Sequence, residues 1–157
     1  MFDRGAPCGY CNANDAFHAS SLSDEGEGPY IVMKTALEIA GLNTGQIDFI
    51  NAHGTGTENN DRVESIAMVR LFDKVPAFTS TKANTGHTLG AAGAIEAVYS
   101  ILNLRYQELY PGLHFENPIT GIGLAPLQTY KETAVNHVLS NSFGFGGNCS
   151  SLIFSKT

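Results

Sequence analysis

The chain has 157 residues, of which 43% are hydrophobic and 15% charged, and its net charge is −6 at neutral pH. This composition is typical of one folded domain with its own core, and it excludes a disordered or low-complexity chain. The acidic charge, without a basic cluster, argues against a nucleic-acid partner. We find neither a membrane-spanning stretch nor a signal peptide, so we expect a cytoplasmic protein that is not bound to a membrane.

The three cysteines are expected to be reduced thiols. Cys8 and Cys11 have the C-x-x-C spacing of a metal knuckle or a redox site. Only Cys149 remains as a further thiol ligand, no histidine stands at finger-like spacing, and the segment does not open a helix. We therefore interpret Cys8 and Cys11 as two thiols without a joint role, and we predict no metal site.

The first predicted helix covers about 29–40, since Pro29 suits a first helical turn and Gly41 suits a helix exit. Its apolar stripe is expected to consist of Ile31, Ala36, Ile39 and Ala40. A short buried strand is predicted at 46–52, where apolar residues follow one another.

A second helix is predicted at 61–72, followed by a strand at 75–79 and a polar loop at 80–88. The third helix, 89–104, opens on Leu-Gly-Ala-Ala-Gly-Ala, with small residues around its whole circumference. A glycine inside a helix costs about 1 kcal/mol relative to alanine, so Gly90 and Gly93 need a structural reason. Close approach of other backbones on more than one side is such a reason. We expect this helix to be buried between two layers and to lack a covering layer when the chain is alone.

Two strands, 135–145 and 149–155, are predicted to form a hairpin around Gly146 and Gly147. The resulting order is β-α-β-α-β-α-β-β. Alternation of this kind is typical of the α/β class, here with one mixed five-stranded sheet and helices on both of its faces. Without a linker or an internal repeat, residues 1–157 are expected to form a single domain.

Three loop segments, 51–57, 80–87 and 141–147, concentrate the reactive residue types, and each follows or forms the end of a strand. Loops beyond the carboxyl ends of parallel strands converge on one crevice. We therefore expect His53 and His87 to face the same pocket, with Lys82 close by. A neutral imidazole at such a place can donate a hydrogen bond to a developing oxyanion.

Structural explanations exist for the other candidates. We assign His18, His114 and His137 to structural positions. The Gly-Thr-Gly-Thr loop after His53 could cradle a phosphate, yet neither the P-loop pattern nor G-x-G-x-x-G after a strand is present. The G-x-S-x-G elbow of a serine nucleophile is also absent. The residues alone thus indicate two histidines and a lysine around a pocket, with no nucleophile identified.

The three segments resemble, in sequence and order, the C-terminal half of the β-ketoacyl-(acyl carrier protein) synthases of the thiolase-like superfamily. The matching stretches are Asn-Ala-His-Gly-Thr-Gly-Thr at 51–57, Ser-Thr-Lys-Ala-Asn-Thr-Gly-His at 80–87 and Asn-Ser-Phe-Gly-Phe-Gly-Gly at 141–147. The stretch 89–96 continues the second match, and 9–18 is a weaker one. The resemblance implies decarboxylative Claisen condensation of malonyl-carrier protein with an acyl thioester, in fatty acid or polyketide-type biosynthesis.

By the same resemblance, His53 and His87 are the two catalytic histidines that bind the malonyl thioester carbonyl, and Lys82 orients them. The positions that resemble substrate-binding ones are Thr55, Thr57, Phe143 and Phe145, with Phe145 as the gating ring. The positions that resemble structural ones, around a buried water or a monovalent cation, are Asn51, Glu96, Ser140 and Asn141. No cofactor is implied, since the substrates travel on the phosphopantetheine of acyl carrier protein.

In the family, the nucleophilic cysteine lies in the N-terminal half, and neither Cys8, Cys11 nor Cys149 has an equivalent place. The family's Gly-Gly-Thr-Asn also reads Gly-Gly-Asn-Cys at 146–149 here. Without a nucleophile no acyl-enzyme forms, so the chain alone is expected to be inactive. The expected partners are acyl carrier protein and either an N-terminal synthase half or a second copy of the chain. A domain of an ordinary synthase, a subunit of a split synthase, and a non-catalytic scaffold or chain-length-factor-like subunit stay open as explanations.

Overall fold

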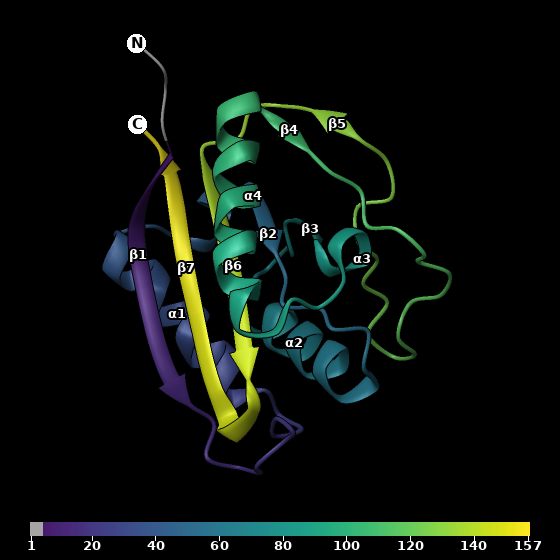
Figure 1. The fold of residues 1–157 in the computed structure, drawn as a ribbon. Coiled ribbons are helices and arrows are strands. Elements are labelled where there is room, and N and C mark those ends of the chain that lie inside the picture. Colours follow the sequence, from purple (N-terminus) through teal and green to yellow (C-terminus); the bar gives the residue numbers. More distant parts are fainter. Residues whose placement is uncertain (1–4) are drawn as a thin grey trace.

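The structure is a computed structural model that describes residues 5–157. Its main sheet has five strands in the order β1-β7-β6-β2-β3 (Figure 1). The strands are β1 (Gly5–Asn14), β2 (Phe49–Asn51), β3 (Ala77–Thr79), β6 (His137–Gly144) and β7 (Asn148–Lys156). Strand β2 runs parallel to β3 and β6, whereas β7 is antiparallel to β1 and β6. The predicted mixed five-stranded sheet and its closing hairpin are confirmed.

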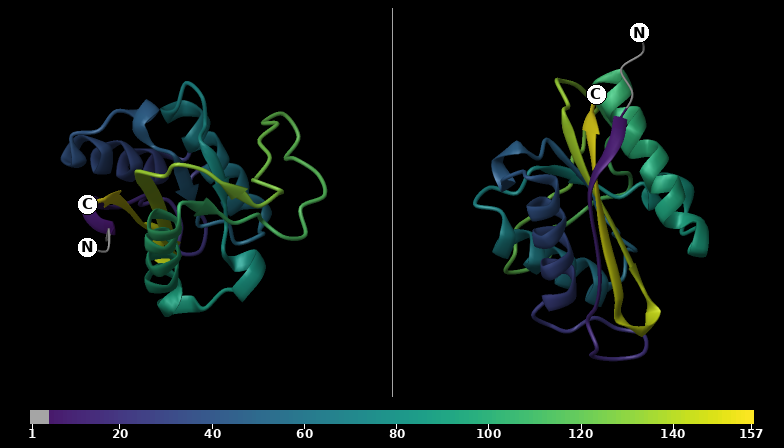
Figure 2. Two further views of the ribbon diagram at one scale, coloured as in Figure 1. Left: turned by 90° about the horizontal axis from the view of Figure 1, so that it is seen from above. Right: turned by 90° about the vertical axis from the view of Figure 1, so that its left-hand side faces the viewer.

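Helices cover the two faces of the sheet unequally. Helices α1 (Glu27–Ala40) and α2 (Glu58–Leu71) lie on one face, and α4 (Ala92–Tyr106) lies on the other (Figure 2). The core on the first face contains Met33 and Met68, and the core under α4 contains Leu104 and Phe154. Helix α4 packs mainly on β6 and reaches one end of β7 and β1, where Leu104 contacts Phe154. In Figure 1, α4 lies in front of β6, and much of β1 and β7 lies to one side of it. The α4 face is therefore only partly covered by this chain.

Helix α1 ends as predicted, at Gly41, which adopts a left-handed conformation with φ 67°. The stripe predicted for this helix is wrong at Ile31 and Ile39, which are 39% and 62% exposed. Ala36 is fully buried as predicted, and Val32 and Met33 are fully buried beside it. The buried face is therefore turned partly away from the predicted one, because several apolar residues of this helix compete for the core.

The third predicted helix is divided in two. A 3₁₀ turn covers Leu89–Ala91, and α4 then begins at Ala92. At Gly93 the expected close approach is present, since a Cβ there would lie only 3.0 Å from Ser142 Oγ of β6. At Gly90 nothing lies within 4 Å of such a Cβ. Close approach thus occurs on the sheet side only, and the other side of the helix is open.

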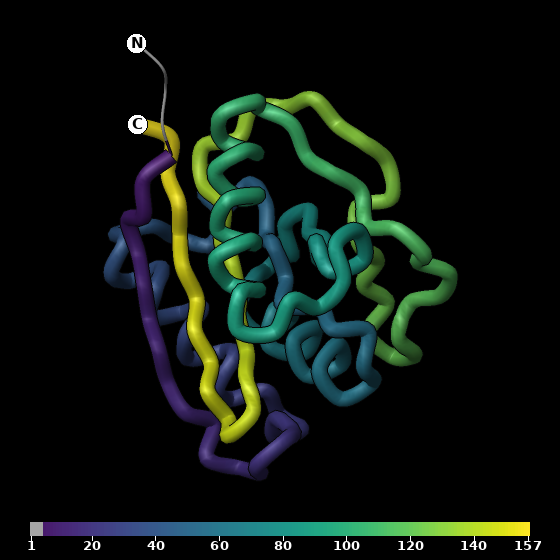
Figure 3. Tube along the Cα trace, in the orientation of Figure 1, coloured from purple at the N-terminus to yellow at the C-terminus, as the bar shows by residue number. Residues whose placement is uncertain are grey.

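The chain between α4 and β6 contains elements that were not predicted. Strands β4 (Glu108–Leu109) and β5 (Lys131–Glu132) pair as a small second sheet. The long loop that joins them runs out beside β3 (Figure 3). A short helix, α3 (Lys82–Thr85), also stands where a polar loop was expected. Within residues 5–157, no helix is long and apolar enough to span a membrane.

Candidate functional site

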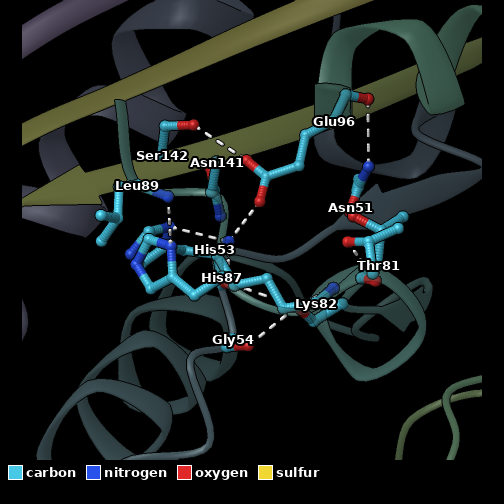
Figure 4. Close-up of polar contacts among 12 residues, drawn as sticks. Asn51, His53, Gly54, Thr81, Lys82, His87, Leu89, Glu96, Asn141 and Ser142 are labelled. Carbon is cyan, nitrogen blue, oxygen red and sulfur yellow. Dashed lines mark hydrogen bonds and ion pairs between the residues drawn. The ribbon is translucent and has the colours of Figure 1, made fainter. Parts of the chain in front are cut away.

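The predicted site residues lie at the carboxyl ends of neighbouring strands. His53 follows β2, Lys82 opens α3 just after β3, and His87 lies in the link from α3 to α4. Phe143 belongs to β6, the other neighbour of β2. Figure 4 shows His53, Lys82 and His87 close together. The structure therefore brings His53, Lys82 and His87 together, as the positions of their loops at strand ends predicted.

The imidazole of His53 is buried and held in one tautomer. The Lys82 ammonium donates to the backbone carbonyl of His53 and lies 3.2 Å from its Nδ1. Because an ammonium has no acceptor, Nδ1 accepts this bond and the ring proton is on Nε2. Burial first, then the charge of Lys82, and last the electrostatic influence of His87 lower the pKa of His53 from 6.5 to about 3. His53 is therefore a neutral N–H donor at physiological pH.

The second histidine has the same tautomer for a different reason. The backbone N–H of Leu89 donates to His87 Nδ1 at 3.1 Å, so the His87 proton is also on Nε2. Leu89 adopts the left-handed region with φ 52°, an uncommon conformation for a leucine. The two rings meet edge to face, with centroids 5.7 Å apart and planes at 86°. The site thus contains two neighbouring imidazoles with Nε2 protons.

A buried ion pair anchors the cluster to α4. Lys82 pairs with Glu96, and the side chains are 6% and 1% exposed. The other carboxylate oxygen of Glu96 accepts from Ser142 Oγ at 3.0 Å. Asn51 donates to the backbone carbonyl of Glu96 at 3.1 Å. Glu96 therefore joins α4, α3, β2 and β6 at one point.

Sequence reasoning missed Glu64. This fully buried residue of α2 accepts from the backbone N–H groups of His53 and Gly54, both at 2.9 Å. It also accepts from the Asn141 amide at 3.0 Å. Burial raises the pKa of Glu64, and these hydrogen bonds oppose the rise. The available signal was an acidic residue within the apolar face of the helix, between Val63 and Ala67.

The expected group around a buried water or cation is divided by the sheet. Asn51 faces α4 with Ser142, whereas Asn141 faces α1 and α2. Neighbouring residues of a strand point to opposite faces, so Asn141 cannot join Glu96. Ser140 is buried and shares the α4 face by the same alternation. Asn51 Oδ1 is buried without a hydrogen-bond partner, which fits a water or a monovalent cation beside Asn51 and Glu96.

Of the four residues predicted to bind substrate, the structure places Phe143 against His53 and Thr55 beside His87 in the same cavity lining. The hydroxyls of Thr55 and Thr57 are 2.9 Å apart. The ring of Phe143 lies 5.4 Å from that of His53, between centroids. Phe145 is 85% exposed in the 3₁₀ turn after β6. Phe143, and not Phe145, is thus the phenylalanine ring that contacts His53 in this structure.

A cavity of about 530 Å³ adjoins the site. Its lining includes the polar side chains of Thr55, Lys82 and His87 and the apolar side chains of Phe78 and Leu113. A site of this size and lining suits a ligand with a polar head and an apolar body. Across residues 5–157, no group of three or more His, Cys, Asp and Glu side chains could hold a metal ion.

The depressed pKa of His53 predicts how stability depends on pH. In the unfolded chain the imidazole binds a proton near pH 6.5, but in the folded chain only near pH 3. The contribution of neutral His53 to the free energy of unfolding is therefore fully present above pH 6.5, and it is lost as the pH falls toward 3. Between pH 7 and pH 5, the free energy of unfolding should fall by about 2 kcal/mol through this residue.

Urea unfolding of the wild type and of His53→Gln at the two pH values measures this contribution. The variant should lose less stability between pH 7 and pH 5 than the wild type does. His18→Gln, at an exposed loop position, is the matched control and should behave like the wild type. Equal pH dependence in the wild type and His53→Gln would contradict the prediction.

Comparisons with known proteins agree with this geometry. Residues 8–116 match the family model described as β-ketoacyl synthase, C-terminal domain. A mitochondrial 3-oxoacyl-[acyl-carrier-protein] synthase of Arabidopsis thaliana is 42% identical over an alignment of 156 positions that covers 95% of this chain and 34% of that protein.

Two solved structures are also similar. A ketosynthase from Xenorhabdus doucetiae, in complex with its chain length factor, has 38% identity and a TM-score of 0.85 over 98% of this chain and 39% of its own. A type II polyketide ketosynthase complex with acyl carrier protein, AntDE:AntF, has 28% identity and a TM-score of 0.90, covering 96% and 38%. The chain thus spans between a third and two fifths of these proteins. It belongs to the β-ketoacyl synthase family, as the C-terminal domain of that family's thiolase-like fold.

Proposed function

We propose that this domain supplies the malonyl-activating half of a β-ketoacyl-(acyl carrier protein) synthase site. The observation that carries the proposal is the pair of Nε2 protons on His53 and His87. Two imidazole N–H donors side by side suit a carbonyl oxygen that becomes negative during a reaction. The relatives compared are named as synthases and ketosynthases. For this reason we do not propose the non-catalytic scaffold.

The proposed chemistry is decarboxylative Claisen condensation. Loss of carbon dioxide from a malonyl thioester leaves its electron pair on the α-carbon and the thioester oxygen, as an enolate. Hydrogen bonds from His53 and His87 stabilise that oxygen, and the α-carbon then attacks the carbonyl of an acyl thioester. The new carbon–carbon bond forms as the acyl group leaves its thiol. Lys82 acts as a positioning residue, because its ammonium binds Glu96 and the His53 carbonyl and fixes the tautomer of His53.

The substrate would enter on the phosphopantetheine arm of acyl carrier protein. Thr55 and Thr57 offer neighbouring hydroxyls to the amides of that arm, at the loop after His53. Phe143 supports the ring of His53, and the exposed Phe145 remains our candidate for a gate. The cytoplasmic location stays a prediction, since the Arabidopsis relative is named as mitochondrial.

The proposed reaction needs a thiol nucleophile, and the described cysteines do not suit that role. Cys149, the cross-strand neighbour of Phe143, is buried. Burial, assisted by the charges of Asp15 and Glu64, raises its pKa to about 12. It is thus a neutral thiol at pH 7, whereas the thiolate is the nucleophile. Cys8 and Cys11 belong to β1, the far edge of the sheet.

The open α4 face is where we place the missing partner. Three large apolar side chains are exposed here: Leu89 in the turn before α4 (77%), Val98 on α4 (56%) and Tyr10 on β1 (54%). Burial of apolar surface contributes about 25 cal/mol per Å², so covering this face would stabilise a complex. We propose that an N-terminal synthase half with its own cysteine covers this face. A second copy of this chain would supply no such cysteine.

The isolated chain should show no condensation, and mixing it with an N-terminal half should restore the reaction. The assay combines an acyl primer with malonyl-carrier protein and detects the ketoacyl product by mass spectrometry. The matched control replaces the cysteine of the N-terminal half by alanine, which should abolish the product. Condensation by the chain alone, above the level of a His53→Ala variant, would contradict the proposal.

A further inference from the structure

A second group of reactive side chains lies at the opposite end of the sheet from the histidine site. His137 begins β6, and its Nδ1 lies 2.7 Å from Ser155 Oγ on β7. Ser155 Oγ in turn lies 2.9 Å from Cys8 Sγ on β1. Three strands thus contribute one continuous chain of thiol, hydroxyl and imidazole. The proposed condensation uses none of these residues.

The local backbone places Cys8 at this point. Pro7 pairs with Phe154 and Gly9 with Ile153, so Cys8 is the extra residue of a β-bulge and has no partner in the ladder. Bulges of this kind redirect a side chain. The Asp48 carboxylate accepts from the backbone N–H of His137 at 3.0 Å, which fixes the start of β6. The sulfur of Cys8 is exposed.

The other two cysteines lack such an arrangement. Cys11 makes only a long contact, 3.8 Å, to the carbonyl of Asn12, and its side chain packs on the core beneath α1. Cys149 is buried and has a raised pKa. The chain therefore contains its own controls, since the reactivity of Cys8 can be compared with that of two thiols in the same molecule.

We propose that Cys8 is a thiol–disulfide exchange site, at which small-molecule disulfides form a mixed disulfide with the protein. The S–H of Cys8 donates to Ser155, whose O–H donates to His137 Nδ1, so both protons can shift toward the imidazole. The Cys8 thiolate attacks one sulfur of the small-molecule disulfide. The mixed S–S bond forms as the original S–S bond breaks, and the leaving thiolate takes up the proton that the imidazole had received. No outside oxidant is needed, because the disulfide itself is reduced.

The test measures the rate at which oxidised glutathione modifies each cysteine of the 157-residue chain at pH 7. Peptide mapping by mass spectrometry separates Cys8 from Cys11 and Cys149. Cys8 should react about tenfold faster than Cys11, since Ser155 and His137 can take up the thiol proton as the sulfur attacks. Ser155→Ala and His137→Gln should each lower the rate at Cys8 about tenfold. Ser155→Thr keeps the hydroxyl and should keep the rate.

Two results would overturn the proposal. One is a Cys8 rate that is unchanged in both Ser155→Ala and His137→Gln, and the other is a Cys11 rate equal to that of Cys8. Circular dichroism and thermal melting establish that each variant is folded. If Ser155→Ala does not fold, the comparison of His137→Gln with the wild type decides the question. The outcome is independent of condensation activity, so failure here leaves the proposed function untouched.

Discussion

Replacing His53 by alanine is expected to lower the condensation rate about 100- to 1000-fold in the complex with an N-terminal half. Alanine removes one of the two Nε2–H donors that would face the enolate oxygen. It also leaves Lys82 without the acceptor that it approaches at 3.2 Å. His87→Ala should have an effect of the same order, because each ring contributes one donor. The measurement is the rate of ketoacyl product formation at saturating malonyl-carrier protein.

The matched control for both variants is His137→Gln, which changes a histidine at the other end of the sheet. It should leave the condensation rate close to that of the wild type. Unfolding curves for the two alanine variants separate lost catalysis from lost structure. If His53→Ala folds and retains more than a tenth of the wild-type rate, the assignment of His53 as an oxyanion donor is wrong.

The sequence was most informative where local chemistry decides the structure. Gly41 at the exit of α1 and Gly146 and Gly147 in the hairpin turn marked the ends of elements correctly, because few other residues adopt their positive φ. The order of strands and helices followed from alternating apolar runs. The small strands β4 and β5 escaped prediction because two-residue strands carry no periodic signal.

The limits of sequence reasoning are clearest at the site itself. That His53, Lys82 and His87 converge could be predicted, because parallel strands present their carboxyl ends at one edge. That Asn141 lies apart from Glu96 could not, since a register difference of one residue moves a side chain to the opposite face. The role of Glu64 could not be predicted either. A buried acid is identified by its hydrogen-bond partners, here two backbone N–H groups, and these cannot be read from the sequence. The tautomers of the two histidines likewise depend on hydrogen bonds to Nδ1 that only the folded structure reveals.

Replacing Glu96 by alanine is expected to lower the free energy of unfolding by about 3–5 kcal/mol. The side chains of Lys82 and Glu96 are 6% and 1% exposed, so the buried ammonium would lose its carboxylate partner where little solvent can replace it. Ser142 would lose its acceptor as well. Urea unfolding at pH 7, followed by circular dichroism, measures the change.

An exposed ion pair on α1 offers the matched control. Lys34 and Glu38 are 3.8 Å apart with side chains 52% and 62% exposed, so Glu38→Ala should cost less than about 0.5 kcal/mol. A second comparison removes both buried charges: Lys82→Met combined with Glu96→Leu should be more stable than Glu96→Ala, because no unpaired charge remains. If Glu96→Ala costs no more than Glu38→Ala, the buried pair does not hold α3 against α4. Lys82 would then need another anchor to keep the His53 proton on Nε2.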